Sequence, residues 1–294
     1  MATGFILYNP LAGNGKCESD VRQLEAKLPA PLEFVDMTQI TDYAQLLQKL
    51  AEDDYLVIVG GDGTINRFAN DTAGIEIPQE ILYYPLGTGN DFAHDVGRQE
   101  ATEPFSITKY LKNLPTVEVK GKVYRFINAV GYGIDGYCCQ VGDEQRKIPG
   151  KKVDYTAIAI KGLLFGFDAV NAKIKVDDQE YTFKKVWIAP TMHGRYYGGG
   201  MIAAPEQDRL SENHTLSLTL FHGAGRLHTL CVFPSIFKGE HVNHPKMVKI
   251  LTGHEITVEF DRPTALQIDG ETILDVTSYT ARSCVAAAKE ATPV

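Results

Sequence analysis

Short apolar segments alternate with amphipathic segments over the first third of the chain. Each apolar segment is followed by a polar or Gly-rich turn and then by apolar residues at helical spacing. The expected strands are residues 5–8, 34–35, 55–59 and 81–84, and the clearest expected helices are residues 18–28 and 42–51. Regular alternation of strand and helix predicts a doubly wound α/β domain with a parallel sheet.

After about residue 120, strand-like segments dominate and are separated by Gly, Pro and Asp. The expected strands are residues 124–130, 172–176, 181–189, 215–221, 255–260, 265–268 and 278–285, with one helix at 152–167. Many short strands with turn residues between them are typical of an antiparallel β-sandwich. We therefore expect an α/β domain over residues 1–124 and a β-sandwich over residues 125–294.

Charge and cysteine content exclude several classes of protein. With 29 basic and 37 acidic side chains the net charge is −8, which argues against a nucleic-acid partner, because duplexes reward a basic face. No apolar run approaches the ~18 residues of a membrane span, and no charged segment precedes the first apolar residues as in a signal peptide. Five cysteines without metal-ligand spacing indicate reduced thiols, hence a cytoplasmic protein.

The first chemical signal is Gly60-Gly-Asp-Gly-Thr-Ile-Asn66, directly after the expected strand at 55–59. Glycines let backbone amides approach an anion, and the following helix presents its positive end. Asp62 would lie beside bound phosphates, which is favourable when a metal ion shares the site. The alternative is a strand-to-helix turn with an Asp cap.

The second signal is Pro85-Leu-Gly-Thr-Gly-Asn-Asp-Phe-Ala93, which follows the next expected strand. Thr88, Asn90 and Asp91 would lie at the carboxyl end of the sheet, where doubly wound folds bind ligands. Two such loops at consecutive strand ends favour a ligand site over two unrelated turns. The turn at residues 9–16 resembles a phosphate loop but lacks the Gly-Lys-Ser/Thr of a Walker A motif.

Together these motifs resemble the catalytic domain of diacylglycerol kinases and related bacterial lipid kinases. Later segments match motifs of that family in the same order, namely residues 128–135, 197–205, 241–245 and 268–271. The resemblance covers essentially the whole chain. It implies an N-terminal α/β nucleotide domain, a C-terminal β-sandwich and an active site in the cleft between them.

The resemblance also implies ATP and Mg²⁺ as cofactors and assigns residues to them. The nucleotide contacts that it implies are Asn9, Pro10, Leu11, Ala12, Gly13, Thr38, Gly60, Gly61, Asp62, Gly63, Thr64, Ile65, Asn66 and Thr88. Asp62 and Asp91, with Glu118 as a third acid, match carboxylates that organise Mg²⁺ through water. Phosphoryl transfer needs such a cation because charge spreads over the transferring oxygens.

The Asp269-Gly270-Glu271 turn matches the family's base region. The resemblance implies that Asp269 accepts the proton of the lipid hydroxyl, with Glu271 assisting or replacing it. Without the resemblance, this tripeptide is simply a hairpin turn.

Some positions depart from the family pattern. Arg67 stands where Glu is common, and His193 replaces a usual Asn. In the segment after Pro205, Asn213 and Ser217 replace acids that hold a structural Mg²⁺ in relatives. Neutral ligands weaken binding of a hard cation, so Asn213 is a weak candidate ligand for that metal.

We therefore expect an ATP-dependent kinase of a lipid hydroxyl, most simply one that converts diacylglycerol to phosphatidate. A kinase of a soluble acceptor is one alternative, since NAD kinases share the Gly-Gly-Asp-Gly turn. A non-catalytic nucleotide or lipid sensor is another, left open by Arg67 and the missing acids.

A lipid substrate implies peripheral association with a membrane surface. The densest basic cluster, Arg146-Lys147 with Lys151-Lys152, precedes the apolar segment 153–167 and is a candidate contact for anionic headgroups. The alternative is a solvated face packed on the sandwich. The sequence is compatible with a homodimer.

Overall fold

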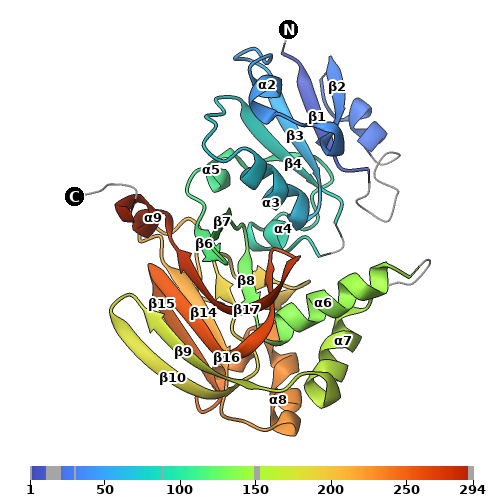
Figure 1. Ribbon diagram of the computed structural model, residues 1–294. Helices are drawn as coiled ribbons and strands as arrows, with labels where there is room; N and C mark the ends of the chain where they lie inside the picture. Colours follow the sequence, from blue (N-terminus) through green and yellow to red (C-terminus); the bar gives the residue numbers. More distant parts are fainter. Residues whose placement is uncertain (1, 11–20, 30, 88, 149–152, 291–294) are drawn as a thin grey trace. The chain divides into compact units, whose positions relative to one another are not determined.

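The chain forms two compact units, Met1–Asn113 and Leu114–Val294 (Figure 1). The computed structural model describes residues 2–10, 21–29, 31–87, 89–148 and 153–290, without the side chains of residues 288–290. Within these described ranges, no helix is long and apolar enough to cross a membrane.

The first unit is built on a five-stranded sheet of order β2-β1-β3-β4-β5. Its strands are β1 (Gly4–Tyr8), β2 (Leu32–Asp36), β3 (Tyr55–Gly60), β4 (Glu80–Pro85) and β5 (Phe105–Ser106). The first four run parallel, and β5 pairs antiparallel with β4. Ile6, Val57 and Ile58 in the central strands are fully buried, as a sheet covered on both faces requires. The four strands expected in this region are confirmed.

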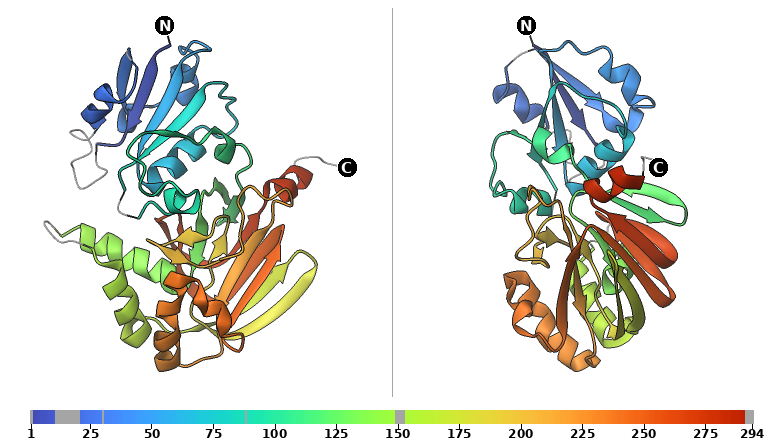
Figure 2. Two further views of the ribbon diagram at one scale, coloured as in Figure 1. Left: turned by 180° about the vertical axis from the view of Figure 1, so that it is seen from behind. Right: turned by 90° about the vertical axis from the view of Figure 1, so that its left-hand side faces the viewer.

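Short helices cover this sheet, which is seen nearly edge-on at the right of Figure 2. They are η2 (Gln23–Ala26), η3 (Met37–Gln39), α2 (Tyr43–Leu47), α3 (Asp62–Asp71), α4 (Asp91–Asp95) and α5 (Thr108–Leu111). Leu24 packs with Ile6 and Val57 of the central strands. Tyr43 of α2 meets Phe68 of α3 edge-to-face, with ring centroids 5.7 Å apart. The unit is the expected α/β domain.

The second unit contains a ten-stranded antiparallel sheet with the path β15-β14-β11-β8-β16-β17-β6-β7 and the β9–β10 hairpin joined to β16. Its strands are β6 (Thr116–Val119), β7 (Lys122–Arg125), β8 (Ala129–Tyr132), β9 (Val170–Val176), β10 (Gln179–Val186), β11 (Thr191–Met192), β14 (Leu216–Phe221), β15 (Val248–Gly253), β16 (Glu255–Ile268) and β17 (Glu271–Arg282), and β12 (Tyr196–Tyr197) pairs separately with β13 (Met201–Ile202).

The long strand β16 lets this sheet fold into a β-sandwich. It pairs with β9 over residues 256–260 and with β8 over residues 266–268, while β17 follows its other edge. Tyr132 stacks on Phe260 at 3.8 Å and meets Tyr279 edge-on at 5.6 Å in the core. The expected antiparallel β-sandwich is confirmed.

Helices of the second unit were only partly expected. They are α6 (Ile134–Arg146), α7 (Tyr155–Lys161), the π-helical turn η4 (Gly162–Gly166), α8 (Arg226–Val232), η5 (Phe233–Lys238), η6 (Glu240–Asn243) and α9 (Cys284–Glu290). The helix expected at 152–167 corresponds to α7 and η4, which lie beside α6 (Figure 1). Neither α6 nor α8 was predicted.

The boundary between the units lies earlier than the 124/125 position expected from the sequence. Hairpin β6–β7 pairs with β17, whose Thr280 and Arg282 are partners of Glu118 and Thr116. Both strands therefore belong to the sheet of the second unit, which begins at Leu114.

A buried carboxyl group lies in the first turn of α6. Asp135 is 8% exposed, and its Oδ1 accepts a hydrogen bond of 2.9 Å from the Tyr197 hydroxyl. Its Oδ2 is buried and has no hydrogen-bond partner among the residues that the structure describes. Burial raises the pKa of Asp135 from 3.8 to about 7, and the Tyr197 bond offsets part of that rise.

We expect this group to make the protein less stable as pH rises from about 4 to 7. In that window the folded state holds a proton that the unfolded chain has released, so stability falls by an amount on the order of 4 kcal/mol and stays low above it. Asp135→Asn should remove this loss. Urea unfolding of the parent and of Asp135→Asn at pH 5 and pH 8 measures this loss. If the free energy of unfolding changes equally with pH in the two proteins, the prediction is refuted.

Candidate functional site

The predicted nucleotide-binding residues follow strands that end at one edge of the first unit's sheet. Strands β2, β1, β3 and β4 are parallel neighbours, so their carboxyl ends lie in a row. Thr38 follows β2, Asn9 and Pro10 follow β1, and Gly61 follows β3. Leu11, Ala12, Gly13 and Thr88 lie outside the described residues.

The loops after β3 and β4 touch each other. The Leu86 N–H donates to the Gly60 carbonyl oxygen at 2.9 Å, and the Tyr83 hydroxyl donates to the same oxygen at 2.8 Å. Burial raises the pKa of Tyr83 well above its ordinary value, which keeps this hydroxyl a donor. A Cβ atom on Gly87 would lie 2.6 Å from the Gly61 Cα. Glycine is needed at these two positions because the two backbones are in contact.

Asp62 joins the two loops through its carboxylate. Its Oδ2 accepts from the Asp91 N–H at 2.9 Å and its Oδ1 from the Phe92 N–H at 2.8 Å. Asp62 begins α3, whereas Asp91 begins α4 and is 5% exposed. The structure thus brings Asp62 and Asp91 together, and Asp62 also caps α4.

Other predicted contacts in α3 point into the protein. Ile65 is fully buried in the core, and Thr64 and Asn66 are 7% and 6% exposed. The Asn70 side chain donates to the Asn66 carbonyl oxygen at 2.9 Å. Arg67 lies on the exposed side and pairs with Asp71 at 3.4 Å. The first turn of α3 therefore offers Gly61, Gly63 and backbone amides to a ligand more readily than the side chains of residues 64–66.

Thr38 lies close to the carboxylate of Asp36. Its backbone N–H and hydroxyl both donate to Asp36 Oδ1, at 2.8 and 2.7 Å. Asn90 adopts the left-handed conformation, and its side-chain amide both accepts from and donates to the Gly87 backbone, at 3.0 and 2.8 Å. These bonds fix the conformations of the loops that follow β2 and β4, the outer two of the four parallel strands.

In the second unit, Asp269 occupies the turn between β16 and β17. Its carboxylate accepts from the backbone N–H groups of Ile127 at 2.5 Å, Asn128 at 2.8 Å and Ala129 at 3.0 Å. Asp269 has a φ of 46°, a left-handed conformation that these bonds help to stabilise. Glu271 is exposed at the start of β17. The two candidate bases thus lie in different surroundings, one oriented by amides and one in solvent.

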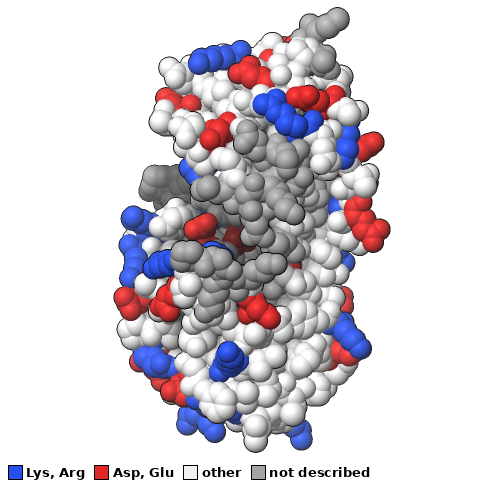
Figure 3. Space-filling view, turned by 90° about the vertical axis from the view of Figure 1, so that its right-hand side faces the viewer, with Lys and Arg blue, Asp and Glu red and all other residues white. Residues whose placement is uncertain are grey.

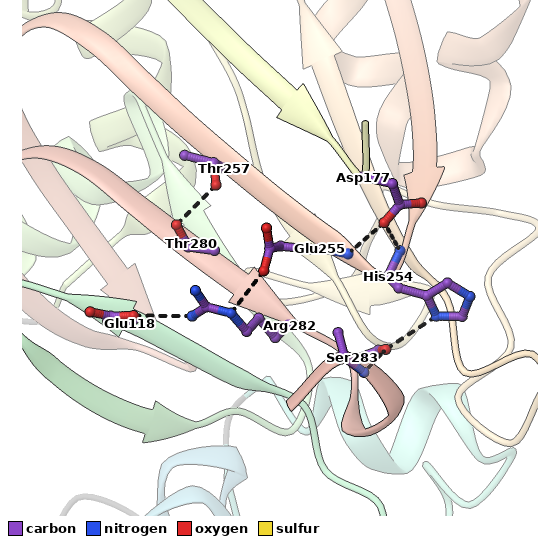
Figure 4. A network of polar contacts seen from close by, with 9 residues as sticks. Glu118, Asp177, His254, Glu255, Thr257, Thr280, Arg282 and Ser283 are labelled. Atoms are coloured by element: carbon purple, nitrogen blue, oxygen red, sulfur yellow. Dashed lines mark hydrogen bonds and ion pairs between the residues drawn. The ribbon is translucent and has the colours of Figure 1, made fainter. Parts of the chain in front are cut away.

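Glu118 lies in the second unit and forms part of an ion-pair network. Its carboxylate is 3.1 Å from Arg282, which also pairs with Glu255 at 2.9 Å (Figure 4). Arg282 is mostly buried at 14% side-chain exposure, whereas Glu118 is half exposed. These contacts give Glu118 a role in joining β6, β16 and β17. Its role toward Mg²⁺ stays a prediction.

The segment around Asn213 does not fit a divalent cation. The Ser217 hydroxyl donates to Gln207 Oε1 at 2.6 Å, and Gln207 Nε2 donates to the Thr215 carbonyl at 2.8 Å. Asn213 is exposed, and its N–H donates to the Ser211 hydroxyl at 3.3 Å. No group of three or more His, Cys, Asp or Glu residues is placed to hold a metal within the described ranges. The hydrogen bonds that join Gln207 to Thr215 and Ser217 connect neutral groups.

Two residues that shape these sites were not singled out in the sequence. Tyr83 lies in an apolar strand, and Arg209 lies in the segment after Pro205. Their partners, Gly60 and Ile127, are 23 and 82 residues away along the chain. No local motif signals such contacts.

Comparison with known proteins assigns both parts of the chain to described families. Residues 3–119 match the family described as "Diacylglycerol kinase catalytic domain". Residues 128–286 match the "YegS C-terminal NAD kinase beta sandwich-like domain".

Whole-chain relatives agree with these matches. The chain is 25% identical over 272 residues to a diacylglycerol kinase of Mycobacterium tuberculosis (strain H37Rv), a match covering 87% of this chain and 84% of that protein. Its fold is similar to the crystal structure of a diacylglycerol kinase from Bacillus anthracis, with a TM-score of 0.60, 20% identity, and coverage of 96% of this chain and 93% of that one.

Proposed function

Because the chain belongs to the diacylglycerol kinase catalytic-domain family, we propose that it transfers the γ-phosphoryl group of ATP to a lipid hydroxyl. Diacylglycerol is the simplest acceptor, with phosphatidate as product. The observation that carries the proposal is the pair of Gly- and Asp-containing loops, joined through Asp62, at the carboxyl edge of the parallel sheet. Transfer of label from γ-labelled ATP to lipid tests it.

The loop after β3 supplies groups suited to phosphates. The Gly60–Gly61 turn leads into the ten-residue helix α3, whose first N–H groups and dipole favour an anion. The Asp62 carboxylate accepts from the backbone N–H of Asp91, and these two acidic residues are our candidates for holding a hydrated divalent cation. When bound, Mg²⁺ would neutralise the charge on the transferring phosphoryl oxygens.

The acceptor side of the reaction needs a group that takes the hydroxyl proton. The hydroxyl oxygen bonds to the γ-phosphorus as the bond to the ADP oxygen breaks, and the proton passes to a carboxylate. Asp269 is our first candidate because three backbone amides fix its orientation. Glu271, two residues away and exposed, is the second.

The acceptor lipid is reached at a membrane surface, and the side of the second unit with α7, η4 and α8 is suited to it. Phe165 in η4 is 84% exposed and Leu227 in α8 is 73% exposed, and these two elements are in contact. Arg226 donates to the Leu163 and Phe167 carbonyl oxygens at 3.1 and 2.8 Å, which joins α8 to η4. Figure 3 views the side on which these helices lie, and its lower part shows white surface with Lys and Arg side chains scattered over and around it. Exposed apolar side chains favour contact with a bilayer surface, and the basic residues Lys151 and Lys152, which lie outside the described residues, would add attraction to anionic lipids.

Charge reversal at Lys151 and Lys152 is expected to weaken binding to anionic vesicles by about 1 kcal/mol per charge. Phe165→Ser should weaken binding to anionic and neutral vesicles alike, because it removes apolar surface that the bilayer would cover. Activity on short-chain monomeric substrate should not change.

Val123→Ser is the matched control, since Val123 is 64% exposed in β7. Vesicle sedimentation measures all four proteins. If the charge-reversed and Phe165→Ser variants bind vesicles as well as the parent does, α7, η4 and α8 have a packing role alone.

A further inference from the structure

A buried guanidinium holds the backbone segment to which Asp269 is bonded. Arg209 is 8% exposed, and its Nη1 donates to the Ile127 carbonyl oxygen at 3.1 Å. Its Nη2 donates to Asn128 Oδ1 at 3.0 Å. A planar guanidinium that makes two directed bonds fixes both the position and the orientation of its partners.

One peptide group connects Arg209 to Asp269. The carbonyl oxygen of the Ile127–Asn128 peptide accepts from Arg209, and the N–H of the same peptide donates to Asp269 Oδ1 at 2.8 Å. A cation and a carboxylate therefore bind opposite ends of one peptide dipole. Each bond polarises the peptide in the direction that strengthens the other.

His193, directly after β11, supports the same segment. Its Nδ1 lies 3.0 Å from the Ile127 carbonyl oxygen, and its backbone N–H donates to the Asn128 carbonyl oxygen at 2.8 Å. The imidazole and the guanidinium thus share the Ile127 oxygen, while the amides of this segment hold Asp269. The orientation of Asp269 depends on how firmly residues 127–129 are held.

The segment that carries Arg209 is closed without a metal. Gln207, Thr215 and Ser217 bond to one another through neutral groups, where the family resemblance implies acids and a divalent cation. A guanidinium is a permanent cation, and this one is provided by the chain itself. Arg209 therefore gives this segment a fixed positive charge, which a bound metal ion would otherwise provide.

We propose that Arg209 is a positioning residue, which orients Asp269 through the Ile127–Asn128 peptide and makes this segment independent of a structural metal. The effect on catalysis rests on the proposed function. The coupling between Arg209 and Asp269 does not, because it concerns the folded protein alone.

Hydrogen exchange tests the coupling without any substrate. In Arg209→Met, the amides of residues 127–129 should exchange at least about tenfold faster, since the bonds to the Ile127 carbonyl oxygen and to Asn128 Oδ1 are lost. Gln207→Met is the matched control in the same segment and should leave these amides unchanged. If the methionine variant does not fold, Arg209→Lys provides the comparison, because one ammonium cannot reproduce the fork. Unchanged exchange in a folded Arg209 variant would overturn the proposal.

Steady-state kinetics test the consequence for catalysis, namely that Arg209 affects the rate through Asp269. Arg209→Met should lower kcat on lipid about tenfold with little change in KM for ATP, and Arg209→Lys should recover part of the loss. Combined with Asp269→Asn, Arg209→Met should lower kcat no further, because both changes act through one carboxylate. Fully additive losses would contradict the proposal. If the parent phosphorylates no lipid, the proposed function fails while the exchange result still decides the coupling.

Discussion

Replacing Asp62 with alanine is expected to lower phosphoryl transfer at least about 10²-fold, since a carboxylate that organises the transferring charge contributes several kcal/mol at the transition state. The same change should also destabilise the first unit by about 1 kcal/mol, a typical value for loss of a helix cap. Both amide partners of Asp62, Asp91 and Phe92, lose their acceptor. The measurement is the rate of ADP formation together with thermal unfolding.

Two further variants separate charge from capping. Asp62→Asn keeps one amide acceptor and removes the charge, so it should be as inactive as Asp62→Ala but more stable. Asp54 is the matched control, because its carboxylate accepts from the Thr3 and Ala51 N–H groups, both at 2.7 Å, just before β3 begins. Asp54→Asn should lose stability without losing turnover at equal folded concentration. Near-normal turnover in Asp62→Asn would remove Asp62 from the site.

Asp269→Asn is expected to lower the rate on lipid about 10²-fold or more while ATP binding is retained. An asparagine presents an NH₂ group to at least one of the three amide donors of residues 127–129, so this variant should also be less stable. Glu271→Gln must be measured alongside, and because Glu271 is exposed its effect on stability should be small. Steady-state kinetics with both substrates and a melting curve for each variant provide the comparison.

The pattern of losses assigns the base. A loss confined to Asp269→Asn, in a variant shown to be folded, supports Asp269. If only the Glu271 change is severe, the role moves two residues along the turn. Full activity in both variants would show that this turn holds no base.

The sequence predicted the four parallel strands of the first unit because each carries its own apolar signal, whereas the two-residue strand β5 was not predicted. The apolar segment Tyr55–Gly60, for example, ends in a glycine, and strand and helix follow each other at short intervals in this unit. In the second unit, α6 was missed because Gly133, Gly136 and Gly142 in and before it weaken the helical pattern. Gly136 is needed there, since a Cβ would lie 1.8 Å from the Ala265 carbonyl oxygen. That requirement comes from tertiary packing and leaves no local trace.

The ends of several strands depend on contacts far apart in the chain. A single strand was expected at residues 124–130, but β7 ends at Arg125 and β8 begins at Ala129. In between, the amides of Ile127 and Asn128 bond to Asp269, about 140 residues away. Likewise the strand expected at 278–285 ends at Arg282, and α9 begins at Cys284. The family resemblance singled out Asp269, whereas its bonds to the amides of residues 127–129 and the role of Arg209 depend on the folded chain.

The central claim is tested most directly by incubating the pure protein with γ-labelled ATP, Mg²⁺ and a panel of acceptors. Micelles of diacylglycerol and of other lipid alcohols should be compared with NAD and a blank, with Asp62→Asn as the inactive control. The account predicts label in a chloroform-soluble product, most strongly with diacylglycerol, and none with Asp62→Asn. Label in NAD with none in any lipid, or no transfer of label to any acceptor, would contradict the account.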